Sequence, residues 1–176
     1  MTTTGAGAAL PILDLPSRAD PNLRLDARRL AEGLSELLRV IQFRDRDRVC
    51  CYDISASQCY ALKGVVARGG LTVNELAAYL YVDKSTASRI ANSLVDKEYV
   101  GRVAHPEDAR AVRLEPTDQG RALCATIQAD EERDYAALLG DFDPATRSEI
   151  HRLVARLGRC FTEGVEAEGG SCCVVR

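Results

Sequence analysis

The sequence predicts a mainly α-helical fold that carries one small β-hairpin. Three observations predict it in this chain of 176 residues. Long stretches repeat apolar residues at three- and four-residue steps, which is the period of an amphipathic helix. Several of these stretches begin with a side chain that is suited to capping a helix. Only the segment 99–115 contains two short stretches with the residue pattern of β-strands.

The N-terminal third is predicted to contain an arm and one long helix. Residues 1–22 hold prolines and glycines without periodicity, so we expect a flexible arm. A helix begins at Leu23, and its apolar stripe runs to Ile41. The alternating charges of residues 44–48 are expected to form a polar segment that follows this helix. Residues 50–53 then form a short connection.

Three helix starts follow in the middle of the chain. Ser55–Gln58 and Thr72–Glu75 both have the capping-box pattern, in which the first side chain caps the backbone and the last reaches back. Asp83 is a good N-cap for a helix over residues 84–97. Gly69 and Gly70 indicate the C-terminal end of the first of these helices.

A hairpin and two long helices complete the chain. Strands are expected at residues 99–104 and 111–115, with a polar loop between them. Thr117 caps a long helix that ends near Leu139, and Asp143 with Pro144 begins the last helix. Residues 72–115 therefore have the layout of a winged helix-turn-helix, with a turn at residues 81–83.

The second helix of this unit is suited to a B-DNA major groove. Its exposed positions hold small or hydrogen-bonding residues, which can contact phosphates and base edges. These residues are Ser85, Thr86, Ser88, Arg89 and Asn92. We also expect the N-terminus of this helix to offer backbone donors to a phosphate. The alternative interpretation is a solvated polar helix face.

The loop of the hairpin carries a second candidate contact. An arginine at a wing tip can enter a narrow minor groove, and Arg110 is placed there. Asp108 could orient this arginine. The alternative is a solvated loop salt bridge that contributes little to stability.

Charge limits how such a unit could bind DNA. The formal net charge is -3, and residues 72–115 hold six basic and seven acidic side chains. Binding by bulk charge is therefore excluded, and local placement and dimer symmetry must supply the attraction. The sparse aromatic content also argues against a site for single-stranded nucleic acid, in which bases stack on aromatic rings. A protein-binding winged helix that never touches DNA is the alternative that this charge balance supports.

Two stretches resemble the MarR family of regulators. LAAYLYVDKSTASRIANSLVDKEYV, residues 76–100, is similar to its helix-turn-helix, and PEDARAVRLEPTDQGRAL, residues 106–123, to its wing and following helix. The resemblance implies Lys84 as a further major-groove reader and Arg110 as the wing contact. Two departures are visible: Pro116 stands where a leucine is usual, and Glu98 where a glycine is usual.

The resemblance also implies an assembly and a function. The family's proteins are homodimers with interlocked terminal helices, and they bind palindromic double-stranded DNA until a ligand or thiol chemistry releases them. We therefore expect residues 23–52 and 117–163 to be dimerisation helices, residues 53–116 to be the DNA-binding lobe, and residues 164–176 to be a cysteine-containing tail. The expected role is a transcriptional repressor.

Seven cysteines are the unusual feature of the composition. Cys59, Cys124 and Cys160 lie on predicted helices and are interpreted as core or interface residues. The other four stand as adjacent pairs in predicted irregular segments, where no small hydrophobe is needed. These are Cys50, Cys51, Cys172 and Cys173. Exposed thiols in such places favour a functional role.

The expected role is binding of a thiophilic effector. Zinc-like spacing is absent, and thiolate-only sites favour soft ions, so arsenite or mercury is expected to bridge the two cysteine pairs. No obligatory cofactor is implied. Oxidation of these thiols is one alternative, and a small aromatic ligand in a pocket between the dimerisation and DNA-binding parts is another.

Several other classes are not expected. The chain lacks a C-x-x-C motif, a G-x-S-x-G elbow and a glycine-rich phosphate loop, so it is not expected to be an enzyme. No apolar run is long enough for a membrane span, and residues 1–9 lack the features of a secretory signal. We therefore expect a cytoplasmic protein without a membrane partner.

Overall fold

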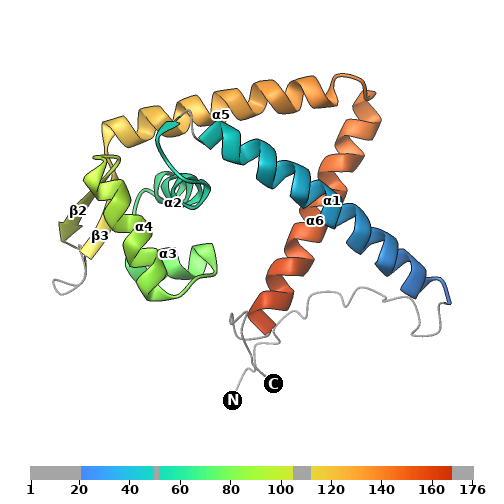
Figure 1. Cartoon of the computed structure of the whole chain (residues 1–176), viewed down its shortest axis with the longest axis horizontal. Helices are drawn as coiled ribbons and strands as arrows, with labels where there is room; N and C mark the ends of the chain where they lie inside the picture. The colour runs from blue at the N-terminus through green and yellow to red at the C-terminus, as the bar shows by residue number, and fades with distance from the viewer. Residues whose placement is uncertain (1–20, 50–51, 105–111, 168–176) are drawn as a thin grey trace, which may run out of the picture. The chain divides into compact units, whose positions relative to one another are not determined.

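The computed structural model describes residues 21–49, 52–104 and 112–167 (Figure 1). Helices dominate, and the short strands form one small sheet, so the predicted fold class is confirmed. The elements in chain order are α1 (Leu23–Val49), α2 (Ala56–Ala67), β1 (Leu71–Thr72), α3 (Val73–Leu80), α4 (Lys84–Asp96), β2 (Val100–Ala104), β3 (Val112–Pro116), α5 (Asp118–Leu139) and α6 (Pro144–Ala167). Helix α1 as far as Asp47 falls in one compact unit, and its last two residues with α2 to α6 fall in another.

The predicted helix starts are confirmed at the level of hydrogen bonds. Both capping boxes form: in the second, the Glu75 N–H donates to Thr72 Oγ1 over 3.2 Å, and the Thr72 N–H donates back to the Glu75 carboxylate over 2.7 Å. Asp83 caps α4 and Thr117 caps α5. These local interactions fix where each helix begins.

Three helices of the lobe end in the same kind of turn. At the end of α2, the N–H of Gly69 donates to Val66 O and that of Gly70 donates to Val65 O. This pair of bonds defines a Schellman motif, which places one residue in the left-handed region. Gly69 has φ 66, but the equivalent residues after α3 and α4 are Tyr81 with φ 53 and Glu98 with φ 61. Two of the three turns therefore lack the glycine that suits this conformation best.

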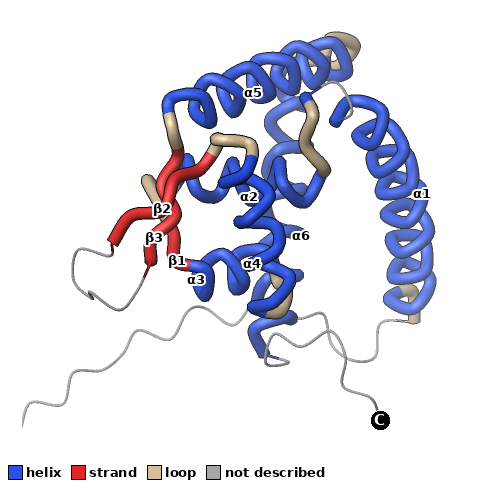
Figure 2. The backbone as a smooth tube through the Cα atoms, turned by 60° about the vertical axis from the view of Figure 1, so that its left-hand side comes forward, coloured by secondary structure: helices blue, strands red, loops and turns tan. Residues whose placement is uncertain are grey.

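The sheet has three strands, which is one more than the sequence predicts. Their order is β1-β3-β2, and both pairings are antiparallel (Figure 2). In β1, Leu71 pairs with Leu114 of β3. The guanidinium of Arg113 donates to Gly69 O over 2.9 Å, which ties the same strand to the end of α2. The base of the hairpin is thus joined to the segment that precedes α3.

One hydrophobic core holds the lobe together. It is formed by α2, α3, α4, the sheet and the first half of α5. The largest fully buried side chains are Leu62, Leu76, Leu94, Leu114, Val65, Val100 and Cys124. Each large aliphatic side chain buried in this way contributes about 1.5–3 kcal/mol relative to an exposed one.

Polar contacts fix α5 against the base of the lobe. Lys63 of α2 forms an ion pair with Glu131 of α5 at 2.5 Å, and the hydroxyl of Tyr52 donates to Asp130. The paired Glu131 carboxylate raises the pKa of Lys63 against the effect of its partial burial. Both contacts join segments that are far apart in sequence, so they define the direction in which α5 leaves the lobe.

Two predicted boundaries are wrong. Helix α1 continues to Val49, so the alternating charges of residues 44–48 belong to the helix rather than to a polar segment that follows it. Helix α6 continues to Ala167, into the segment expected to be an irregular tail. A run of alternating charges is compatible with a helix, which explains the first difference. Among the helices of the described ranges, none is both long and apolar enough to cross a membrane.

Candidate nucleic-acid interface

The N-terminus of α4 is organised by one carboxylate. Asp83 accepts hydrogen bonds from the Thr86 N–H at 2.9 Å, from Thr86 Oγ1 at 2.7 Å and from Ser85 Oγ at 2.5 Å. The hydrogen bond from Ser85 and, to a smaller extent, those from Thr86 hold the pKa of the Asp83 carboxyl well below its usual range. The carboxylate is therefore ionised at neutral pH and lies at the positive end of the helix dipole.

This arrangement changes two expectations from the sequence. The Ser85 and Thr86 hydroxyl protons are donated to Asp83, so in this structure they are not directed outward to a phosphate. The Thr86 N–H is likewise taken by the capping carboxylate. The anion that the helix N-terminus favours is thus the protein's own Asp83.

The exposed face of α4 carries the remaining predicted readers. Arg89 is exposed and donates to Thr86 Oγ1 over 3.0 Å, so its guanidinium lies along the helix surface rather than against the core. Lys84 is exposed and Ser88 is half-buried. The opposite face is buried through Ala87, Ala91 and Leu94. The helix therefore presents a polar stripe outward over its first two turns.

Asn92 accepts a hydrogen bond from Arg102, which is not among the predicted site residues. Arg102 of β2 donates from Nη2 to Asn92 Oδ1, and both side chains are exposed. Strand alternation contains a signal for this contact: Arg102 is two residues beyond the buried Val100, so it shares the strand face that is directed toward the helices. The wing base and the third turn of α4 are thus joined by a side-chain hydrogen bond.

The wing tip and the paired cysteines lie outside the described residues. This holds for Asp108 and Arg110, and for the four predicted effector cysteines, Cys50, Cys51, Cys172 and Cys173. Within the part of the chain that the structure describes, no group of three or more His, Cys, Asp or Glu side chains could hold a metal ion.

The three remaining cysteines have different surroundings. Cys59 and Cys124 are buried in the core, as predicted. Burial raises the pKa of the Cys124 thiol, although Lys63 nearby acts in the opposite direction. Cys160 of α6 is exposed in the single chain. A buried thiol with a raised pKa is protonated at neutral pH and has little nucleophilic character.

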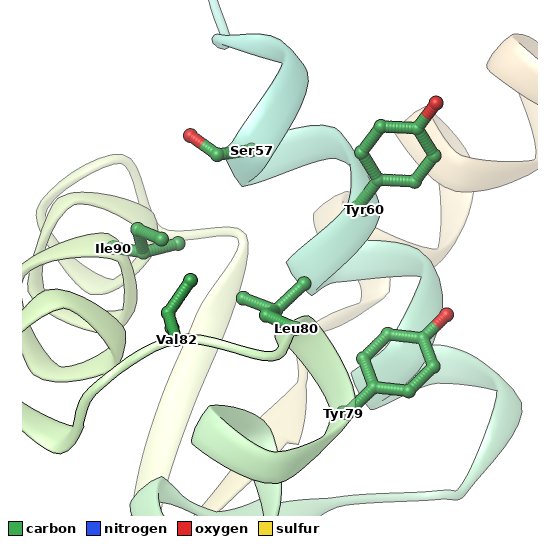
Figure 3. Close-up of a pocket in the computed structure, with 6 residues that line it drawn as sticks. All are labelled: Ser57, Tyr60, Tyr79, Leu80, Val82 and Ile90. Carbon is green, nitrogen blue, oxygen red and sulfur yellow. The ribbon is translucent and has the colours of Figure 1, made fainter. Parts of the chain in front are cut away.

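A small apolar hollow lies between α2, α3 and α4. Its volume is about 320 Å³, and it is lined by Ser57, Tyr60, Tyr79, Leu80, Val82 and Ile90. Figure 3 shows the two tyrosine rings on one side and Val82 with Ile90 on the other. The Arg68 guanidinium lies 4.3 Å from the centre of the Tyr79 ring, which helps to fix that wall. None of the lining side chains is an acid, a lysine or an arginine.

Comparison with known proteins gives consistent similarities. Residues 52–111 match the family model described as MarR family. The chain is 26% identical over 121 residues to YsmB of Bacillus subtilis, an uncharacterized HTH-type transcriptional regulator, which covers 69% of this chain and 81% of the relative.

Solved structures share the fold. A MarR family protein from Bacillus stearothermophilus superposes with a TM-score of 0.72 at 23% identity, covering 79% of this chain and 97% of that one. Streptococcus pneumoniae FabT, which was solved in complex with DNA, superposes with a TM-score of 0.70 at 17% identity, covering 78% and 98%.

Proposed function

Because this chain is a DNA-binding transcriptional regulator of the MarR family, we propose that it binds palindromic double-stranded DNA as a homodimer. The observation that carries the proposal is the polar outer stripe of α4, opposite a fully buried face. In this arrangement α4 enters the major groove and Arg110 of the wing reaches the adjacent minor groove. The same relatives confirm that the chain is not an enzyme.

Exposed apolar side chains support the homodimer. On α1, Phe43 is 63% exposed, and on α6 Val154 is 62% and Phe161 60% exposed. They belong to regular stripes, and apolar stripes of this size rarely stay in water. Symmetric pairing would bury the same stripe twice and would present two copies of α4 to a palindrome.

DNA affinity tests this function directly. Arg89→Ala should weaken binding to a duplex that the wild-type protein selects from a random library, by about 1–3 kcal/mol for each lost base contact. Arg152→Ala is the matched control, because it removes the same charge from an exposed α6 residue that pairs with Glu149. Unchanged affinity of Arg89→Ala in fluorescence anisotropy at fixed salt would contradict the assignment of this reader.

We further propose that a thiophilic effector such as arsenite, or mercury, releases the DNA. The support comes from the sequence: Cys50, Cys51, Cys172 and Cys173 are adjacent pairs without zinc-like spacing. Replacing both Cys172 and Cys173 by serine should preserve DNA binding and remove the response to arsenite. Cys124→Ser is a control, since that thiol is buried in the core. Release by peroxide but not by arsenite would favour the redox alternative.

A small apolar effector is a second candidate, and the hollow beside α4 favours it. Its lining is apolar apart from three hydroxyl groups, which suits an uncharged molecule with a flat body. Such a ligand would touch Val82 and Ile90 next to the turn that positions α4. Ser57→Leu would narrow this hollow and Ala56→Leu would not, so only the first should reduce binding of 2-naphthol measured by calorimetry.

A further inference from the structure

Asn92 and Arg102 form a polar pair between the recognition helix and the wing. The Arg102 guanidinium donates to the side-chain carbonyl oxygen of Asn92. Asn92 lies in the second half of α4, and Arg102 is the central residue of β2. Both side chains are exposed, so the pair lies on the outer surface of the lobe.

The pairing disfavours direct reading of adenine by Asn92, because it turns one lone pair of the amide oxygen toward β2. A bidentate contact with adenine needs the side-chain oxygen to accept from N6 while the amide donates to N7. That oxygen already accepts from Arg102. Asn92 is also seven residues beyond Ser85, which is about 10 Å along the helix axis. Recognition helices place their N-terminal residues against base edges, so Asn92 lies where α4 leaves the groove.

We propose that Arg102 contacts a DNA phosphate and that Asn92 is its positioning residue. A guanidinium has five N–H donors, and the bond to Asn92 uses one of them. The others can bind a phosphate in the planar, two-donor manner that arginine favours. In a segment without net positive charge, one oriented cation per subunit is a substantial part of the attraction. The inference rests on the proposed DNA-binding function and assigns Asn92 a role different from base reading.

The test is DNA affinity as a function of salt. The probe is a duplex that the wild-type protein selects from a random library, and binding is followed by fluorescence anisotropy. Arg102→Ala should weaken binding about tenfold and lower the slope of log affinity against log salt by about two per dimer, one for each lost phosphate contact. Arg102→Lys should keep the slope, because the charge stays. Arg152→Ala is the charge control.

A double-mutant cycle separates positioning from reading. Asn92→Ala should weaken binding about threefold, and the variant with both changes should bind no more weakly than Arg102→Ala, because the two residues act through one contact. The base preference of Asn92→Ala, measured by repeating the selection, should equal that of the wild type. Thermal unfolding of each variant verifies that the lobe is folded.

Three outcomes would overturn the inference. In the first, Asn92→Ala changes the base preference at one position of each half-site, and the affinity losses of Asn92→Ala and Arg102→Ala add up in the double variant. Asn92 would then be a base reader. Wild-type affinity and salt slope in Arg102→Ala show that Arg102 makes no phosphate contact. If the wild-type protein itself selects no duplex, DNA binding fails as a whole and the inference fails with it.

Discussion

Gly120 of α5 lies directly against the main-chain carbonyl oxygen of Tyr99, one residue before β2. A Cβ atom at position 120 would lie 2.0 Å from that oxygen. The N–H of Thr117 donates to the same oxygen over 3.2 Å, and Thr117 Oγ1 donates to Glu98 O over 2.7 Å. The first turn of α5 is therefore fitted onto the backbone that connects α4 to the wing.

Gly120→Ala should destabilise the lobe by about 1–3 kcal/mol, because backbone and not a flexible side chain must move to admit the methyl group. Urea unfolding followed by circular dichroism measures the loss. Gly101→Ala in β2 is the control: the nearest atom to its Cβ position is Glu115 O, at 4.0 Å, which is an ordinary contact. There alanine should be neutral or stabilising, because glycine inside a strand costs about 0.5–1 kcal/mol relative to alanine. Equal stability of Gly120→Ala and wild type would contradict the close fit.

Two substitutions in the Schellman turns should change the free energy of unfolding in opposite directions. Glu98→Gly should raise the free energy of unfolding by up to about 1 kcal/mol, since a side chain in the left-handed region costs about 1–2 kcal/mol and glycine offsets part of this by its own chain entropy. Gly69→Ala should lower stability, although its Cβ position is open. Glu98→Ala, which keeps the Cβ atom, should resemble wild type in thermal unfolding. A Glu98→Gly protein no more stable than Glu98→Ala would show that backbone strain is not the cause.

Asp83 gives α4 a pH dependence. Its carboxyl pKa is lowered in the folded state, so the stability it contributes is present above the unfolded pKa of about 3.9. That contribution is lost as the pH falls below this value toward the folded pKa. Asp83→Asn keeps a capping acceptor without the charge, and it should therefore lose less stability than wild type between pH 7 and pH 3 in urea unfolding. An equal loss in both proteins would count against this linkage.

The apolar stripe of α6 gives a test of the proposed homodimer. Val154→Asp should weaken dimerisation at least about a hundredfold, because a two-fold interface places the introduced charge twice in an apolar contact. Ser148→Asp adds the same charge on the opposite side of α6, where the side chain is exposed, and should leave the dimer intact. Sedimentation velocity across a concentration series distinguishes the two. A dimer unaffected by Val154→Asp would exclude this stripe from the interface.

Local interactions made most of the fold predictable. The capping boxes at Ser55 and Thr72 involve residues three apart, so they can be recognised directly in the sequence. Strand β1 was missed because it has two residues and its partner, Leu114, lies far along the chain. The left-handed residue at Tyr81 was missed because no glycine marks it, whereas the resemblance had marked Glu98 as standing where a glycine is usual.

The candidate site was predictable only in part. The exposed stripe of α4 follows from helical periodicity, and the comparisons support its role in DNA binding. The partner of Asn92 depends on how β2 packs against α4, and helix periodicity alone does not contain that contact. Likewise, the occupation of the Ser85 and Thr86 hydroxyls by Asp83 depends on rotamers rather than on residue type.

The short strand β1 has a consequence for the DNA that the protein can use. Thr72 both ends β1 and caps α3, and β1 is paired with the wing strand β3. Helix α3 and the described base of the wing are therefore linked through two adjacent residues, Leu71 and Thr72. In the proposed complex with DNA, this link sets the distance between the helix-turn-helix and the wing within each subunit. The proposed homodimer would then tolerate operators that differ in the spacer between half-sites more readily than operators that differ within a half-site.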